Sequence, residues 1–176
     1  MKEVKGQVWV ETVIYTLIAL VMIGLVLSVA KPKIEKFQDK AVIETSIEII
    51  EQIDLLIKEV EYYKAGNQRL MGIDLKKGTL KIDGINDQLI FEMESREQYT
   101  EFGTNYTEKG LLITSEKKGE LNTIDIIKDY SARYNITSQQ KDDIKTLSKS
   151  SSQYELVISN KGEDSDGRTK INFEIN

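Results

Sequence analysis

The chain of 176 residues contains no cysteine and no histidine. Without cysteine, disulfide bonds, thiolate nucleophiles and cysteine-based metal sites are excluded. Without histidine, a Ser-His-Asp triad and imidazole ligation of a metal are excluded as well. The acidic residues are scattered without an evident catalytic pair, and neither a phosphate-binding glycine loop nor a dinucleotide fingerprint occurs. The sequence therefore predicts a protein that is not an enzyme and that uses no cofactor or metal.

A strong excess of either charge is also lacking. The 29 acidic residues against 24 basic ones give a formal net charge of −5. No basic cluster interleaved with aromatic residues appears, so the sequence does not indicate a nucleic-acid partner. Small extracellular domains often use disulfides to supplement their core, and this chain depends on packing alone.

One long apolar segment stands out from the charged remainder. From Thr12 to Ala30, nineteen consecutive residues carry no formal charge, and a helix of about 20 apolar residues spans the ~30 Å hydrocarbon core of a bilayer. In lipid such a segment is helical, because a helix satisfies its own backbone polar groups. We predict a membrane span at residues 12–30. A secretory signal peptide cleaved after Ala30 is an alternative, although its apolar core is normally shorter.

A single carboxylate, Glu11, directly precedes this span. An isolated carboxylate at the centre of a membrane helix costs roughly 2.5–3.5 kcal/mol on insertion scales, so an acid in this position usually has a partner. One reading leaves Glu11 in the headgroup region beside Trp9, whose ring suits a membrane interface. The other pairs Glu11 with a cation.

The segment Lys5-Gly6-Gln7-Val8-Trp9-Val10-Glu11-Thr12-Val13-Ile14-Tyr15 resembles the amino terminus of archaeal type IV pilin-like proteins, which carry a class III signal peptide. The resemblance extends over roughly residues 5–60. In that family a membrane-embedded aspartyl prepilin peptidase cuts after the glycine, which here implies cleavage within Lys5, Gly6 and Gln7 and loss of residues 1–6. Glu11 then becomes the fifth residue of the mature chain, where type IV pilins place their glutamate. Archaeal flagellins share the leader but typically lack this glutamate, so Glu11 favours a pilin.

Cleavage would give Gln7 a new α-amine, which is mostly protonated at neutral pH. Removing one partner of a buried ion pair costs about 3–5 kcal/mol. Our hypothesis is that Glu11 of one subunit neutralises the Gln7 amine of a neighbour and so sets the axial register of a filament.

The lysines around the span do not by themselves place the amino terminus in the cytoplasm. Two precede the span and four follow it: Lys2, Lys5, Lys31, Lys33, Lys36 and Lys40. Glu35 and Asp39 are interleaved with the following lysines, and long domains cross the membrane largely regardless of their charge. The cytoplasmic leader is therefore implied by the resemblance.

The helix is predicted to continue to residue 66, with a kink near Pro32, the only proline in the chain. Apolar residues recur beyond it at helical spacing and should hold a globular domain. They are Ile34, Phe37, Ala41, Ile43, Ile47 and Ile50, with Ile49, Ile53, Leu56 and Val60 along a neighbouring line. Lys64-Ala65-Gly66-Asn67 is typical of a helix end, with glycine available for a left-handed cap.

Residues 67–176 are predicted to form one β-rich head domain outside the membrane. Eight strands are expected, at 79–82, 88–94, 110–115, 121–130, 133–137, 144–147, 154–159 and 170–175. Residues 121–130 also fit a helical period, and strand is the interpretation we favour. Lys117-Lys118-Gly119 and Asn160-Lys161-Gly162 are predicted turns. A small antiparallel sheet or sandwich should therefore pack on the helix.

Two further motifs lie in the head. Asn105-Tyr106-Thr107 and Asn135-Ile136-Thr137 are sequons, so Asn105 and Asn135 are candidate N-glycan acceptors. Residues 163–167 alternate oxygen-bearing side chains before a glycine, as in part of a calcium loop, but the distal glutamate of such a loop is not identifiable. A hairpin turn is the simpler interpretation.

The sequence thus predicts an α+β fold of type IV pilin-like layout, with a long N-terminal helix and a small antiparallel β-sheet head. The resemblance implies a structural pilin, major or minor, that lies in the membrane before assembly and in an extracellular surface filament afterwards. Its partners would be membrane lipid, the prepilin peptidase and copies of itself or related pilins, with adhesion as the leading use. The alternatives are a single-pass anchored protein with an exterior binding domain and a secreted domain cleaved near Ala30.

Overall fold

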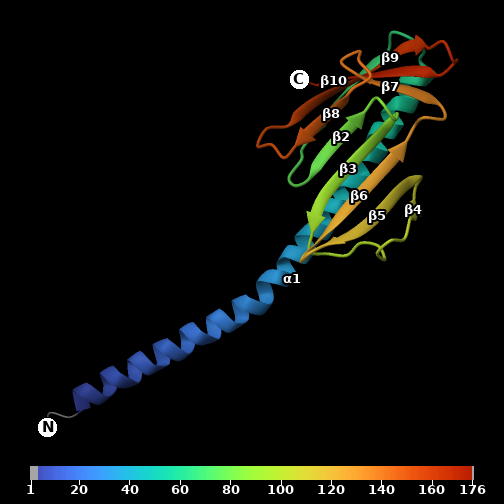
Figure 1. The fold of residues 1–176 in the computed structure, drawn as a ribbon. Coiled ribbons are helices and arrows are strands. Elements are labelled where there is room, and N and C mark those ends of the chain that lie inside the picture. Colours follow the sequence, from blue (N-terminus) through green and yellow to red (C-terminus); the bar gives the residue numbers. More distant parts are fainter. Residues whose placement is uncertain (1–3, 176) are drawn as a thin grey trace. The chain divides into compact units, whose positions relative to one another are not determined.

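The computed structural model describes residues 4–175, and their side chains from residue 8 onward. It confirms the α+β architecture: one long N-terminal helix, α1 (Val4–Tyr62), is followed by β-sheets (Figure 1). The chain divides into two compact units, Met1–Gln38 and Asp39–Asn176, and the boundary between them lies inside α1. The head unit therefore begins at Asp39 and includes the last part of the helix.

Pro32 belongs to the first unit and lies inside α1. Proline removes one backbone donor from the helical ladder, yet the helix is assigned continuously on both sides of it. The kink near Pro32 stays a prediction.

Two sheets make up the β structure of the second unit. A six-stranded sheet has the order β4-β5-β6-β3-β2-β8, and a four-stranded sheet has the order β1-β9-β10-β7. Neighbouring strands are antiparallel, except that β10 and β7 are parallel. The strands are β1 (Gln68–Ile73), β2 (Thr79–Asp83), β3 (Gln88–Ser95), β4 (Tyr106–Glu108), β5 (Leu111–Lys118), β6 (Leu121–Asp129), β7 (Tyr134–Ser138), β8 (Ile144–Ser148), β9 (Tyr154–Glu163) and β10 (Thr169–Ile175).

The eight strands expected from the sequence are all present as β2, β3 and β5 to β10, and residues 121–129 are a strand, as favoured. Strands β1 and β4 were not predicted. Both are edge strands, and in β1 the apolar residues Leu70 and Met71 are adjacent, so the sequence does not alternate. Strand β4 has only three residues, too few to produce a period.

The predicted turn at Asn160-Lys161-Gly162 is wrong, because these residues belong to β9. The pairing of β9 with β10 is irregular here, with Glu163 opposite Thr169 but Asn160 opposite Ile171. Gly162 has a φ of 97°, a conformation that glycine adopts without the steric cost of a side chain. The turn-like composition therefore encodes a β-bulge within a longer strand.

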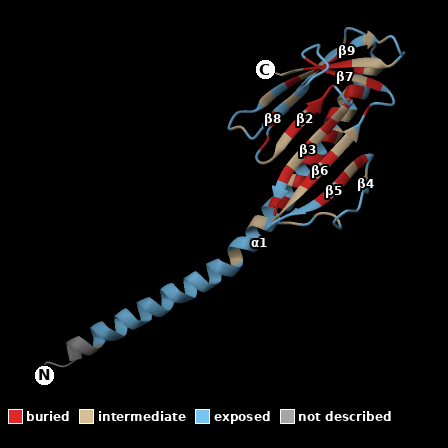
Figure 2. Ribbon diagram, in the orientation of Figure 1, coloured by how far each residue is buried: buried red, intermediate tan, exposed pale blue. Residues whose placement is uncertain are grey.

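The core of the second unit is formed by one face of α1 and the inner faces of both sheets (Figures 1 and 2). From the helix it takes Ile43, Ile47, Ile50, Ile53, Ile57 and Val60, which are all almost completely buried. Their spacing of three or four residues keeps them on one side of the helix.

The apolar stripe of α1 begins later than the sequence predicted. Ile34 and Phe37 are 54% and 73% exposed, and Ala41 is exposed as well. Helical spacing places residues on a common face but does not show where the covering sheet begins. The stripe that holds the head therefore starts at Ile43.

The helix ends at Tyr62 and not at residue 66, as the sequence predicted. The first left-handed residue after it is Lys64, with a φ of 73°, and Gly66 follows with a φ of 90°. The Gly66 N–H donates to the Asn160 carbonyl, with an N–O distance of 2.9 Å, and the Asn160 side-chain amide donates to the Val60 carbonyl at 3.2 Å. The bulge in β9 thus satisfies backbone groups where the helix stops.

Candidate assembly site and surface features of the head

Glu11 is exposed on the helix of the first unit. The Tyr15 hydroxyl donates to Glu11 Oε1 across 3.3 Å, which is long for a bond between two oxygens. The two residues are four apart and therefore share one face of the helix. A carboxylate accepts about four hydrogen bonds, so the tyrosine occupies a small part of the capacity of Glu11. The remainder can serve a cation.

The predicted cleavage site lies just before Glu11. Lys5, Gly6 and Gln7 belong to the backbone of α1, but their side chains lie outside the described part of the chain. Residues 1–3 of the predicted leader lie outside it as well. Cleavage after Gly6 and the pairing of Glu11 with the Gln7 amine therefore stay predictions.

The apolar side chains of the first unit are exposed around the whole circumference of the helix. Leu25, Val26 and Leu27 are 59%, 61% and 60% exposed, although successive helical residues point about 100° apart. The most apolar window of the helix has none of its residues buried within the described structure. This surface has the length and composition of a membrane anchor.

The hydroxyl groups in the apolar stretch are satisfied within the helix. Thr12 Oγ1 donates to the Val8 carbonyl at 2.9 Å, and Thr16 Oγ1 donates to the Thr12 carbonyl at 2.9 Å. Ser28 donates to the Leu25 carbonyl at 2.7 Å. Such bonds lower the cost of placing a hydroxyl in lipid. Glu11, which directly precedes this stretch, is the one formally charged residue between Val8 and Ala30.

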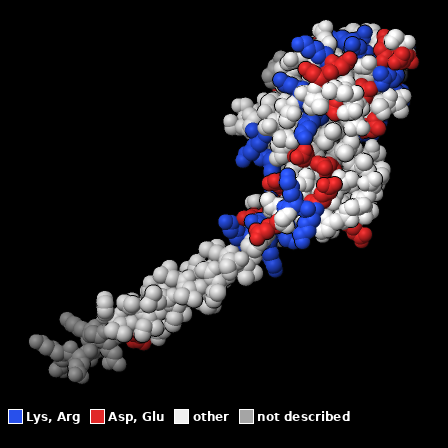
Figure 3. All heavy atoms as spheres, in the orientation of Figure 1, with Lys and Arg blue, Asp and Glu red and all other residues white. Residues whose placement is uncertain are grey.

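Charged residues begin directly after the apolar stretch. Figure 3 shows the change from an uncharged surface to one with mixed lysines, arginines and acids. Lys31 and Glu35 form an i,i+4 pair in the first unit at 4.0 Å, and Lys40 and Glu44 form another in the second at 3.9 Å. Both pairs are partly exposed, and exposed pairs contribute little to stability. They lie in the charged part of the helix that follows the apolar surface.

The helix is fixed to the sheets at the start of the second unit by Asp39, which is 4% exposed. Its Oδ2 accepts the Arg96 backbone N–H at 2.7 Å, and its Oδ1 accepts a hydrogen bond from Lys77 Nζ. Lys77 precedes β2 and Arg96 follows β3. From the sequence, Asp39 was interpreted only as an acid between lysines, because its partners are 38 and 57 residues away.

A second polar contact lies near the end of α1. Arg133 Nη2 lies 2.8 Å from Glu61 Oε2, and the Tyr134 hydroxyl donates to the same oxygen at 2.8 Å. Burial raises the pKa of Tyr134, and the hydrogen bond to Glu61 raises it further, so the hydroxyl stays protonated as a donor. Polar contacts thus hold the helix at both ends of its apolar stripe.

The two candidate glycan acceptors lie in different environments. Asn105 is exposed in the loop before β4. Asn135 is half-buried in β7, and its Nδ2 donates to Asp164 Oδ2 at 3.1 Å.

In the acidic segment at residues 163–167, Glu163 is the last residue of β9, and the rest forms the turn between β9 and β10. Asp164 Oδ1 accepts the backbone N–H groups of Asp166 and Arg168, each at 2.9 Å. Hydrogen bonding from the Arg168 backbone is the largest cause that lowers the pKa of Asp164. The carboxylate therefore organises the turn itself, as aspartate commonly does. Among the described residues, no group of three or more acids is placed to hold a metal ion.

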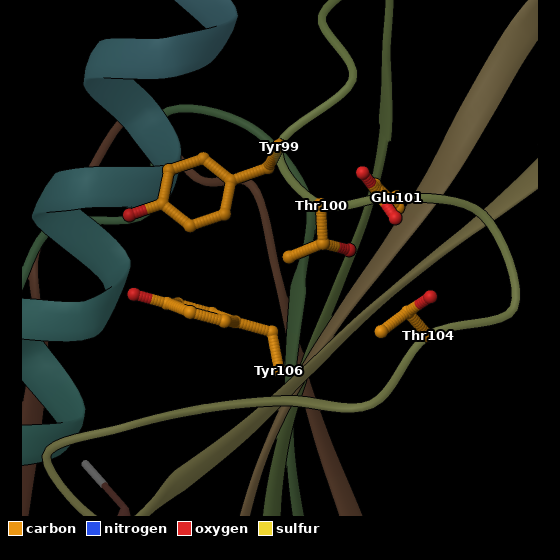
Figure 4. Close-up of a pocket in the computed structure, with 5 residues that line it drawn as sticks. All are labelled: Tyr99, Thr100, Glu101, Thr104 and Tyr106. Atoms are coloured by element: carbon orange, nitrogen blue, oxygen red, sulfur yellow. The ribbon is translucent and has the colours of Figure 1, made fainter.

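A small hollow of about 210 Å³ lies beside the loop between β3 and β4. It is lined by Tyr99, Thr100, Glu101, Thr104 and Tyr106, and the rings of Tyr99 and Tyr106 extend in the same direction with a gap between them (Figure 4). The sequence offered only a weak signal for it, namely three aromatic residues, Tyr99, Phe102 and Tyr106, within a short segment that also contains two threonines.

No protein-family model, curated protein or solved structure matches the chain.

Proposed function

We propose that this chain is the structural subunit of a type IV pilus-like surface filament. The observation that carries the proposal is an apolar helix exposed on every side, with one carboxylate near its start, joined to a separately packed β-rich head. Such a helix requires lipid or other protein around it. The membrane supplies the lipid before assembly. A filament core of identical helices then supplies the surrounding protein.

The proposed assembly mechanism depends on Glu11. After cleavage before Gln7, the new amine of one subunit meets the Glu11 carboxylate of its neighbour as the helices leave the lipid. An unpaired carboxylate is costly in an apolar environment, so the pair favours the one axial register in which both charges are matched.

The proposed partners follow from this mechanism. They are membrane lipid before assembly, the prepilin peptidase at the leader, and copies of this or related pilins in the filament. Adhesion is the proposed use, because a head repeated along a fibre binds a surface through many weak contacts. The function needs no catalysis and no cofactor.

The second candidate is a single-pass protein that stays anchored by residues 12–30 and binds a ligand or envelope component with its head. The exposed apolar helix supports it equally, and the hollow at Tyr99 and Tyr106 offers a contact surface. This function requires no cleavage after Gly6.

The mature amino terminus tests these functions directly. It would be measured by mass spectrometry on protein from the membrane fraction and from material sheared off native cells. A start at Gln7 in sheared material supports the pilin. An uncleaved start confined to membranes rejects the pilin in favour of the anchored protein, and a start at Lys31 in the medium leaves a secreted domain. A Gly6→Val variant, blocked at the predicted cleavage site, supplies the uncleaved reference.

A further inference from the structure

The two sequons of the head differ in their accessibility to a modifying enzyme. Asn105 and Thr107 are both exposed. The loop before Asn105 turns sharply at residues 101–104, where the Thr104 N–H donates to the Glu101 carbonyl at 3.1 Å and Gly103 has a φ of 71°. Thr107 lies on β4, which pairs with β5 on one side and forms an edge of the six-stranded sheet. The whole sequon is therefore presented at the surface.

The second sequon is built into the four-stranded sheet. Asn135 pairs with Lys170 of β10, and its amide nitrogen donates to Asp164. Thr137 is completely buried, and its hydroxyl donates to Asn172 Oδ1 at 3.0 Å. Exposing this hydroxyl would separate β7 from β10 and leave buried polar groups of Asn172 without a partner.

N-glycan transfer requires both parts of a sequon to be reachable. The asparagine amide nitrogen forms a bond to the anomeric carbon of the sugar, the bond from that carbon to the lipid phosphate breaks, and the amide loses one proton. The enzyme must also contact the hydroxyl two residues further on. We propose that Asn105 is the N-glycan acceptor of the folded head, and that folding makes Asn135 inaccessible to the modifying enzyme. Both tripeptides match the same Asn-X-Thr motif. The co-reactants are an oligosaccharyltransferase and a lipid-phosphate-linked oligosaccharide.

The surroundings of Asn105 also suit a sugar. Phe102 and Tyr106 are 43% and 47% exposed, and Thr104 and Tyr106, the direct neighbours of Asn105, both line the hollow in Figure 4. Aromatic rings pack well against the C–H faces of pyranoses, and threonine hydroxyls can bond to sugar hydroxyls. A glycan at Asn105 would cover apolar surface that is otherwise exposed to water.

The inference rests on one part of the proposed function, namely that the head lies outside the cytoplasm. The anchored alternative shares this location. The mature amino terminus tests whether the chain is a pilin, and the glycan occupancy tests whether Asn105 is the acceptor. Either proposal can therefore fail without the other.

The experiment uses the full chain, folded in detergent, with a purified oligosaccharyltransferase that accepts Asn-X-Thr and its lipid-linked oligosaccharide donor. Two synthetic peptides, residues 101–111 and 131–141, serve as unfolded substrates. Glycopeptide mass spectrometry measures the occupancy of each asparagine. We expect both peptides to be modified, whereas in the folded chain the occupancy of Asn105 exceeds that of Asn135 at least tenfold.

Two variants complete the test. Thr107→Ala should abolish modification of the folded chain, and Thr137→Ala should leave it unchanged. Modification of Asn135 in the folded chain at a level comparable to Asn105 overturns the proposal. So does an unmodified Asn105, whether or not the peptide of residues 101–111 is modified.

Discussion

At the residue scale, the charge of Glu11 is the feature on which the proposed assembly depends. Its carboxylate is exposed beside the Tyr15 hydroxyl, and it directly precedes a stretch without formal charge. A glutamine in its place keeps the size and the ability to accept a hydrogen bond but cannot neutralise an amine. The charge can therefore be tested separately from the shape.

We predict that Glu11→Gln leaves leader cleavage unchanged and reduces the yield of sheared filaments by at least about a hundredfold, because a buried amine that loses its carboxylate costs about 3–5 kcal/mol. Immunoblots of the membrane and sheared fractions measure both effects. Tyr15→Phe, which removes only the hydroxyl, is the matched control and should assemble like wild type. Wild-type filament yield from Glu11→Gln would remove Glu11 from the mechanism.

Asp125 carries a second charge with a measurable consequence. It lies on β6 directly opposite Glu92 of β3. Burial raises the pKa of Asp125, the carboxylates of Glu92 and Glu116 raise it further, and Lys81 acts in the opposite direction. The folded state therefore holds this proton more tightly than the unfolded state, whose pKa is about 3.9. The contribution of Asp125 to stability falls as the pH rises from about 4 through the raised pKa.

Asp125→Asn should accordingly stabilise the head at pH 7 by about 0.2–1 kcal/mol, the range for unfavourable charges opposite each other in a sheet. The gain should vanish below about pH 4, where the aspartate is protonated in both states. Thermal unfolding followed by circular dichroism at both pH values measures the difference. Glu120→Gln, in the exposed turn between β5 and β6, is the control. A gain that persists at low pH would mean that packing, and not charge, is responsible.

At the scale of elements, α1 has different surroundings along its length. The residues before the boundary at Gln38 expose apolar side chains on all faces, whereas Ile43 to Val60 bury a single stripe under the sheets. Asp39 and Glu61 make polar contacts to loops and strands near the two ends of this stripe. The second part of the helix is therefore a component of the head core.

Replacing Ile53, which is completely buried, by alanine should destabilise the head by about 2–5 kcal/mol, through lost apolar burial and the cavity left behind. Leu55→Ala removes a similar volume from a side chain that is 64% exposed and should change stability by less than about 0.5 kcal/mol. Urea unfolding of both variants gives the comparison. Equal destabilisation would contradict the placement of the stripe.

The strands show which elements of the head can be predicted from the alternation of apolar residues. Eight of them were predicted because their apolar residues alternate between turns, as in β3, where Leu89, Phe91 and Met93 are buried. Strands β1 and β4 were not predicted, because an edge strand needs little buried surface and so carries few apolar residues in alternation. The bulge at Asn160 to Gly162 was read as a turn, since a glycine with positive φ serves both structures.

At the scale of the whole molecule, the boundary at Asp39 determines which part of the chain can fold alone. The sequence predicted a head of residues 67–176, but the compact unit contains residues 39–176. The helix supplies six of the buried residues of the core, from Ile43 to Val60. A head without them would expose the inner faces of its sheets.

We expect a fragment of residues 39–176 to be soluble and to unfold cooperatively, whereas a fragment of residues 67–176 aggregates or stays unfolded. The full chain should require detergent or lipid, because its first unit buries none of its most apolar window. Size-exclusion chromatography and circular dichroism of the three proteins measure these differences. A folded 67–176 fragment would show that the helix is dispensable for the head.

The α+β class, the apolar segment at residues 12–30 with Glu11 before it, and most of the strands could be predicted from the sequence. These features are local, because length, composition and periodicity act on residues close together in the chain. The start of the apolar stripe, the hydrogen-bond partners of Asp39 and the accessibility of each sequon became known from the folded structure. These depend on contacts between residues far apart in the sequence, such as Asp39 with Arg96 and Thr137 with Asn172.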